Sequence, residues 1–215
     1  MDFMTMLNQL SIGMLETLKI FLLTLIFSLP LGLLIAFGRM SKFFIIRNIT
    51  KFYISIMRGT PLMLQLLVVY FGPYYIFGFD IGGYKFIAII IAFSINYAAY
   101  FGEIYRSGIS SISKGQYEAA NLLGYNKAQT FFKIIFPQVF KMVLPSITNE
   151  VITLVKDTSL AFALAHMEMF SKAKQIAAAQ TTFMPFLIAA LFYYVFNYIV
   201  AFIMERTEKK LSYYR

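Results

Sequence analysis

The side chains best suited to chemistry in this sequence lie inside long apolar stretches. They are Asn96 and Glu103 in one stretch, and Glu150, Asp157, Thr158 and Ser159 in another. Carboxylates held among apolar residues can bind an ammonium group or relay protons. On a helix, Glu150 and Asp157 are seven residues apart and share a face. The spacing therefore predicts a polar surface that suits a positively charged group.

Two interpretations of this set are open. The six side chains line a pathway for a solute, or they neutralise one another and form contacts between helices or subunits. Lys156 lies beside Asp157 and can pair with an acid of its own helix or of a neighbouring one. Because polar residues inside a membrane segment mark pathways by default, we expect the set to line a pathway.

The composition argues against several kinds of catalytic site. With 0 Cys and 1 His, the chain has no thiolate or histidine cluster for a metal, and no Cys–His nucleophile pair. The acids are not grouped as a hard-metal site requires. The phosphate-loop pattern G-x-x-x-x-G-K-[ST] is absent. We therefore expect that the chain is not an enzyme and that it binds neither a metal nor a nucleotide.

The elements that position these side chains are predicted to be membrane-spanning helices. The chain is 60% hydrophobic and 13% charged, which is too apolar for a soluble domain. Since a span needs roughly 20 apolar residues, the apolar runs predict about five helices, near 14–38, 57–79, 84–105, 139–165 and 183–204. The runs are continuous rather than alternating, which argues against a β-barrel. The fold class is all-α integral membrane.

The orientation follows from the distribution of Lys and Arg. The loops on one side of the predicted spans hold 14 of these residues and the loops on the other side hold 3. Since basic loops stay in the cytoplasm, we expect the N-terminus outside and the C-terminus inside. The net charge of +9 then reflects anionic lipid rather than nucleic acid. The first apolar run is too long for a signal peptide, so we expect it to be retained.

One polar segment interrupts this pattern on the predicted cytoplasmic side. It reads "EAANLLGYNKAQTFFKIIFPQ" (118–138) and predicts two short helices. They bend at Gly124, with Asn126 as a helix cap, and Pro137 opens the next span. Ala119, Ala120, Leu122 and Leu123 would give an apolar surface. That surface fits a partner's groove or the lipid interface, and these features alone favour neither.

Two further groups invite structural interpretations. The first is "RGTP", which is Arg58, Gly59, Thr60 and Pro61. We expect it to shape the entry of the second span, because Thr60 can cap a helix and Pro61 suits a first helical turn. The alternative is a gating contact. His166 and Glu168 follow the fourth span on the outer side, where we expect solvated or interfacial side chains rather than ligands.

The polar segment resembles the EAA signature of the inner-membrane permease subunits of ABC importers. That signature is E-A-A, three residues, Gly, nine residues, Ile, one residue and Leu-Pro. The matching positions are Glu118, Ala119, Ala120, Gly124, Ile134 and Pro137, and Phe136 replaces the usual Leu. The stretches "IMRGTPLMLQLLVVYF", "SINYAAYFGEIYRSGI" and "NEVITLVKDTSL" are similar to polar-amino-acid permeases of the histidine/glutamine/arginine type.

This resemblance implies a type I ABC importer permease fold in the bacterial cytoplasmic membrane. It implies a transmembrane domain over 12–207, an external segment 1–11 and a cytoplasmic tail 208–215. The coupling helices within 113–136 would contact an ATPase through the EAA residues. The implied partners are a second permease, two ATP-binding subunits that hold ATP and Mg, an external solute-binding protein, membrane lipid and an amino-acid substrate, with no nucleic acid.

Three other functions are alternatives to amino-acid import. An ABC importer for another small solute differs only in cargo. An ATP-independent, ion-coupled transporter could use Glu103, Glu150 and Asp157 as a cation path, but it leaves the EAA spacing unexplained. A membrane-embedded enzyme needs a nucleophile–base or metal constellation, which one histidine and no cysteine hardly allow.

Overall fold

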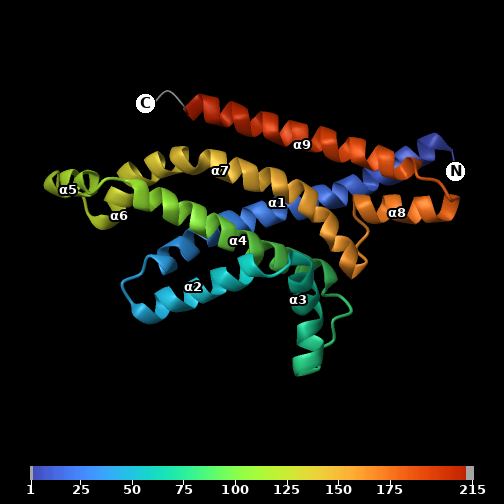
Figure 1. Cartoon of the computed structure of the whole chain (residues 1–215), viewed down its shortest axis with the longest axis horizontal. Helices are drawn as coiled ribbons and strands as arrows, with labels where there is room; N and C mark the ends of the chain where they lie inside the picture. Colours follow the sequence, from blue (N-terminus) through green and yellow to red (C-terminus); the bar gives the residue numbers. More distant parts are fainter. Residues whose placement is uncertain (1, 212–215) are drawn as a thin grey trace.

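The computed structural model describes residues 2–211, and within that range the chain forms helices joined by short loops (Figure 1). The α-helices are α1 (Phe3–Arg39), α2 (Phe44–Gly59), α3 (Leu62–Phe77), α4 (Lys85–Ser111), α5 (Lys114–Leu122), α6 (Lys127–Gln129), α7 (Phe136–Asp157), α8 (Met169–Gln180) and α9 (Met184–Leu211). A π-helical segment, Thr130–Ile135, joins α6 to α7, and a 3-10 helix, Thr158–Leu164, follows α7. The last four residues of the predicted tail lie outside the described part of the chain.

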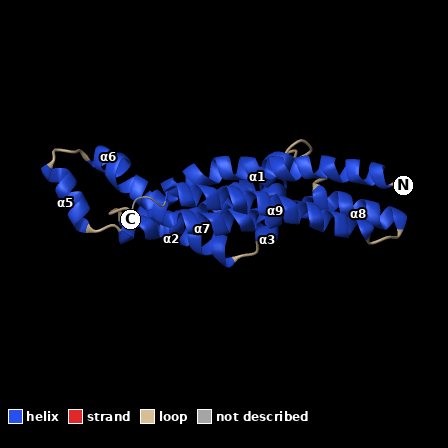
Figure 2. Ribbon diagram, turned by 90° about the horizontal axis from the view of Figure 1, so that it is seen from above, coloured by secondary structure: helices blue, strands red, loops and turns tan. Residues whose placement is uncertain are grey.

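Four long helices, α1, α4, α7 and α9, run along the long axis of the molecule (Figure 1). The short helices α5 and α6 lie at one end, and α8 lies at the other end with the N-terminus (Figure 2). Within the described residues, four helices are long and apolar enough to cross a membrane, or five if the bent pair α2–α3 counts as one span. The prediction of about five spans is thereby confirmed.

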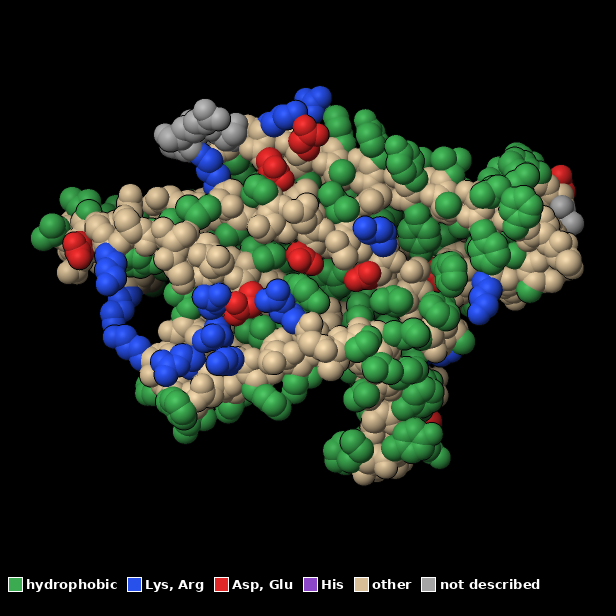
Figure 3. All heavy atoms as spheres, viewed as in Figure 1, with side chains coloured by type: hydrophobic (Ala, Val, Ile, Leu, Met, Phe, Trp, Pro, Cys, Tyr) green, Lys and Arg blue, Asp and Glu red, His purple; other side chains and the backbone are tan. Residues whose placement is uncertain are grey.

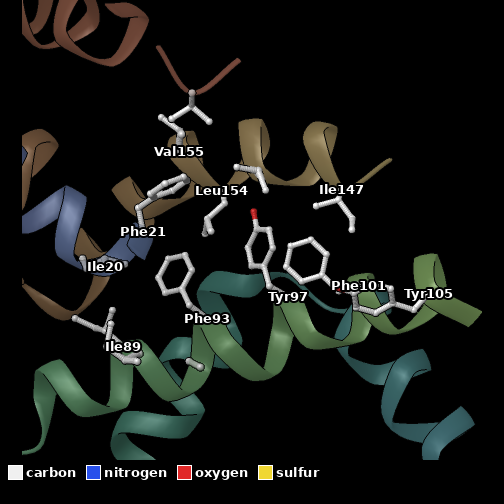
Figure 4. Packing of buried hydrophobic residues seen from close by; sticks show 14 of the residues in the cluster. Ile20, Phe21, Ile89, Phe93, Tyr97, Phe101, Tyr105, Ile147, Leu154 and Val155 are labelled. Atoms are coloured by element: carbon white, nitrogen blue, oxygen red, sulfur yellow. The ribbon is translucent and has the colours of Figure 1, made fainter. Parts of the chain in front are cut away.

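The core forms where α4 packs between α1 and α7. Phe93, Tyr97 and Phe101 of α4 are at most 2% exposed, and they face Phe21 of α1 and Leu154 of α7 (Figure 4). Apolar side chains on three sides of α4 explain why this helix is the most deeply buried of the predicted spans. The core therefore fixes the position of the polar side chains on α4 and α7.

Glycine allows α1 and α4 to approach closely. A Cβ built on Gly32 would lie 2.7 Å from the Cβ of Phe101 and 3.2 Å from the backbone nitrogen of Gly102. On the other helix, a Cβ at Gly102 would lie 2.7 Å from Cγ2 of Ile35. Small residues at such a crossing let two membrane helices pack backbone to backbone, which is where their association energy comes from.

The second span, predicted near 57–79, is present as α3 (Leu62–Phe77), but it begins after a bend and not at residue 57. The chain bends by 113° between α2 and α3, and Thr60 at the break is extended, with φ −123° and ψ 150°. Pro61 has no N–H to continue α2 and disfavours the helical conformation of the residue before it. Consequently α3 leaves the bundle at a steep angle, as Figure 1 shows.

The bend between α2 and α3 is held by side-chain amides. Gln65 Nε2 donates to the Met57 and Thr60 carbonyl oxygens at 3.1 Å and to Thr60 Oγ1 at 2.8 Å. Asn96 Nδ2, from α4, donates to the Met57 carbonyl at 3.0 Å and to Gln65 Oε1 at 2.9 Å. These bonds satisfy the carbonyls that the bend frees, and they tie the end of α2 to α4.

Candidate functional site

Acidic and basic side chains gather on one face of the bundle, between α2 and α7 (Figure 3). Asp157 Oδ2 accepts a 2.7 Å hydrogen bond from the Tyr97 hydroxyl of α4. Glu150 and Asp157 act electrostatically on the same tyrosine, so the predicted shared face of α7 is turned towards α4. Charged groups at this depth need protein or water beside them, so this face cannot lie against lipid tails alone.

A cleft of about 440 Å³ opens on this face between α2, α4 and α7. Its charged lining is Arg58 of α2, Glu103 and Arg106 of α4, and Glu150 of α7. Glu103 is neutralised within the fold, because Arg106 donates to both of its carboxylate oxygens at 2.8–3.0 Å and Arg39 Nε lies 3.8 Å away. The guanidinium of Arg58 lies 5.2 Å from the centre of the Tyr100 ring.

The structure separates the six residues predicted to line a pathway. Glu103 and Glu150 line the cleft, and Asp157 lies on the same face bonded to Tyr97. Asn96 is 4% exposed and serves the α2–α3 bend instead.

The two hydroxyls that follow Asp157 take other positions. Thr158 is buried and donates to the Val155 carbonyl at 2.7 Å. Ser159 donates to the Lys156 carbonyl at 2.7 Å, and the two residues line a second cavity of about 340 Å³ against α8 and α9. Both hydroxyls lie in or at the start of the 3-10 helix, whose tighter turn displaces them from the face that an α-helix would give them.

The polar segment 118–138 projects from one end of the bundle as α5 and α6 (Figure 2). Gly124 has φ +77°, its N–H donates to the Asn121 carbonyl, and the Tyr125 N–H donates to the Ala120 carbonyl. This pair of bonds is a Schellman motif, which the predicted glycine bend requires. Asn126 caps α6 as predicted, in a reciprocal capping box with Gln129.

The surface of this segment is apolar at its tip. Leu122 is 89% exposed and Leu123 is 75% exposed, while Ala120 is buried at 1%. Glu118 lines an open pocket of about 800 Å³ between α5, α6, the π-helical segment and the end of α1. Two largely exposed leucines on a well-capped turn cost free energy in water, so this tip is suited to burial against another surface.

The segment after α6 differs from the helix that the sequence predicts. Residues Thr130–Ile135 are π-helical, and Pro137 lies in the first turn of α7. A π-helical hydrogen bond spans five residues, one more than in an α-helix. Pro137 cannot donate a backbone hydrogen bond, and the side chain of Gln138 donates to the Ile134 carbonyl at 2.7 Å. Ile134 is thus in the π-helical joint and Pro137 is at the start of the span.

Glu168 is the polar residue that sequence reasoning misjudged most. The predicted solvated carboxylate is 0% exposed at the start of α8. It accepts hydrogen bonds from the Phe170 and Ser171 backbone N–H groups at 2.6 and 2.7 Å, and from the Ser171 and Tyr193 hydroxyls. Burial raises the pKa of Glu168 although these donors oppose the rise. The one sequence signal was its position two and three residues before the N–H groups that it caps.

His166 is also more enclosed than predicted. Its side chain is 15% exposed, with Nε2 3.6 Å from Glu16 Oε2 of α1 and its ring against Phe86 of α4. Burial lowers the pKa of His166, and the nearby Glu16 carboxylate partly offsets this. The loop before α8 is therefore a contact between helices rather than a free surface.

We expect Glu168→Gln to lower the unfolding free energy by about 2 kcal/mol, because an amide nitrogen would face one of the two backbone N–H donors. The pKa of Glu168 is raised in the folded state, so the stability that this group contributes is full below about pH 4.3 and is lost as pH rises through the folded pKa. The advantage of the wild type over Glu168→Gln should shrink from acid to neutral pH. Thermal unfolding in detergent measures this.

The matched control is Glu205→Gln, which changes an exposed acid paired with Lys209 on α9. Such a surface pair contributes little to stability, so its melting temperature should follow the wild type at each pH. A pH-independent difference between wild type and Glu168→Gln would contradict the assigned titration.

The fold and the charged face together define a polytopic membrane protein built to move a solute. A family model described as "Binding-protein-dependent transport system inner membrane component" matches residues 28–213. The chain belongs to this family of membrane transport components.

Named relatives and solved structures agree with this membership. The chain is 40% identical over 201 residues, 93% of its length, to the putative glutamine transport system permease protein GlnP of Rickettsia conorii (91% of that protein). It is equally similar, with the same coverage, to the arginine transport system permease protein ArtQ of Bacillus subtilis. A crystal structure of an amino acid ABC transporter with histidines matches 98% of this chain and 99% of that one, with a TM-score of 0.85 and 32% identity. The MetNI methionine ABC transporter shares the fold, with a TM-score of 0.79 at 19% identity over 99% of this chain and 100% of that one.

Proposed function

We propose that this chain is the permease subunit of an ATP-driven importer and forms half of a membrane pathway for polar amino acids. The observation that carries the proposal is the charged face between α2 and α7, where Glu150 and Asp157 lie in a candidate membrane span and Arg58 lies in the bent pair α2–α3. Ionisable residues in such helices face a protein neighbour or a water-filled passage. A second permease subunit, identical or similar, covers this face and encloses the passage.

The tip of α5 is the point where ATP hydrolysis acts on the permease. Leu122 and Leu123 enter a groove on an ATP-binding subunit, in the helix-in-groove mode that suits an apolar tip on a polar segment. Glu118, Ala119, Ala120 and Gly124 form the helix and its bend, and Ile134 and Pro137 connect it to α7. Two ATP-binding subunits hold ATP and Mg, and the permease binds neither.

The proposed orientation puts α5 and α6 in the cytoplasm. The loops at that end hold most of the 14 basic residues, which supports a cytoplasmic C-terminus and an external N-terminus. A solute-binding protein then docks at the opposite end, near α8. The transmembrane domain is 12–207, and ATP binding biases it between two conformations.

The cargo follows from the acids on the pathway face together with the relatives' names. Asp157 and Glu150 suit a solute with an amino group, and the relatives are named for glutamine, arginine and L-cystine transport. Polar amino acids satisfy both. An importer for another small solute would use the same fold with another lining.

Reconstitution of the whole complex tests the proposal. The permease, its ATP-binding subunit and the binding protein are placed in liposomes with ATP, and uptake of labelled glutamine, arginine and histidine is measured. We expect uptake that needs ATP and the binding protein. Uptake by the permease alone, driven by an ion gradient, would instead support an ion-coupled transporter.

We expect Asp157→Asn to reduce uptake of arginine about tenfold relative to glutamine, because a charge-assisted contact is worth about 1.5 kcal/mol or more. Asp80→Asn is the matched control, because it makes the same substitution in the exposed loop before α4. Uptake ratios in the liposome assay measure the effect. An unchanged ratio in Asp157→Asn would remove this residue from the pathway.

A further inference from the structure

The cleft between α2, α4 and α7 contains two opposite charges that the fold leaves unbonded. Within the described residues, the side chains of Arg58 and Glu150 make no hydrogen bond and no ion pair shorter than 4 Å. The guanidinium of Arg58 rests on the Tyr100 ring at 5.2 Å, and it lies within electrostatic range of Glu150. The two groups thus face one cleft without closing it.

The other charges of the cleft are already paired. Both carboxylate oxygens of Glu103 accept from Arg106, and Arg39 lies beside them. Because Glu103 and Arg106 pair with each other, the unpaired charges that line the cleft are Arg58 of α2 and Glu150 of α7. Unpaired charges in membrane helices are costly, and two that stand apart across a cleft of about 440 Å³ leave room for a small molecule between them.

The position of Arg58 is fixed by its neighbours. The carbonyl of Met57, the preceding residue, accepts from both Gln65 and Asn96. The end of α2 is therefore tied to α3 and α4, and the guanidinium is presented from a rigid helix end rather than from a mobile loop. Rigid presentation is what a binding group needs for precise geometry.

We propose that this cleft binds the backbone of an amino acid as a zwitterion: Arg58 receives the α-carboxylate and Glu150 receives the α-ammonium group. The planar guanidinium offers two parallel donors that match a carboxylate, and the carboxylate of Glu150 accepts from an ammonium group. The proposal rests on the proposed function and deepens it. The site binds the α-carboxylate and the α-ammonium group, which all amino acids share. Asp157 and its surroundings then discriminate between side chains.

Direct binding separates the two halves of the site. The purified permease with its ATP-binding subunit, in nanodiscs without binding protein, is titrated with labelled L-arginine and L-glutamine. The competitors are arginine without its α-carboxylate (agmatine) and arginine without its α-amino group (5-guanidinopentanoic acid), with the corresponding two analogues of glutamine. We expect Arg58→Gln to lower the affinity for both amino acids at least tenfold and to leave that for the decarboxylated analogues unchanged.

The second variant should give the opposite pattern. Glu150→Gln is expected to lower the affinity for the amino acids at least tenfold and to leave that for the deaminated analogues unchanged. Arg58→Lys keeps the charge and loses the planar donors, so it should retain a preference for the amino acid over the decarboxylated analogue. It also provides a folded variant if Arg58→Gln elutes as an aggregate. Arg47→Gln, on the same helix but outside the cleft, should bind as the wild type does.

Three results would overturn the proposal. One is a wild-type complex that binds neither labelled amino acid, and another is an Arg58→Gln variant that weakens amino acids and decarboxylated analogues alike. The third is a rise in ATPase activity without amino acid in both Arg58→Gln and Glu150→Gln, which would identify a lock between α2 and α7. If ATP-dependent uptake in liposomes persists in the wild type, the importer function stands and the zwitterion site alone fails.

Discussion

The Gly32→Leu substitution is expected to separate α1 from α4 and to prevent a stable protein from forming. Even a Cβ at this position would lie 2.7 Å from the Cβ of Phe101 and 3.2 Å from the Gly102 nitrogen, and neither atom is the end of a flexible side chain. Overpacking a buried contact costs about 1–3 kcal/mol. Since the clash here involves backbone, we expect Gly32→Leu to lower the unfolding free energy by about 3 kcal/mol. That loss is a large part of the stability of a typical domain.

Size-exclusion chromatography of a fluorescent fusion in detergent, with its thermal midpoint, measures this effect. Gly72→Leu is the matched control, because a Cβ at Gly72 of α3 would meet nothing within 4 Å. The control should elute as a single peak with an unchanged midpoint. Equal behaviour of the two variants would show that the α1–α4 contact adapts to a larger side chain.

The joint substitution Leu122→Glu with Leu123→Glu is expected to abolish binding of the ATP-binding subunit. Both side chains are at least 75% exposed, so the fold should tolerate the change. Burial of a leucine contributes about 2 kcal/mol, and the loss of two therefore weakens the complex by about 4 kcal/mol, roughly a thousandfold in affinity. Co-purification of the two subunits and ATPase activity in liposomes measure this loss.

Gln116→Glu is the control on the same helix, because it adds a negative charge at an exposed position away from the tip. It should leave the complex intact. If the double variant also co-purifies with the ATP-binding subunit and transports normally, the leucines rest on lipid. The docking role of α5 would then be wrong.

The hydropathy of the sequence predicted which segments form membrane helices, but it could not predict where a helix axis bends. The run from 57 to 79 is predominantly apolar, yet Thr60 and Pro61 break it into two helices at 113°. The sequence predicts Pro61 in the first turn of a span, because proline is common there. The same residue also ends the preceding helix, and choosing between these effects requires knowing that Asn96 and Gln65 bind the freed carbonyls.

Local geometry was predictable where the interacting residues are close in sequence. The bend at Gly124 and the cap at Asn126 depend on residues within five positions, and both are present. The environment of Glu168 depends on Tyr193, and that of Glu103 depends partly on Arg39. Such long-range partners leave no periodic signal, so a buried carboxylate was expected to be solvated.

The π-helical segment between α6 and α7 makes the length of this stretch as important as its composition. Each residue of an α-helix advances the chain by about 100° of rotation. If Thr130–Ile135 rewound as an α-helix with all of its residues, the leucines of α5 would turn by about that angle relative to α7. The wider π-helical turn thus absorbs a surplus residue and keeps the phase between the two ends of the connection. An insertion or deletion that leaves the winding unchanged should be far less tolerated there than changes of side chain.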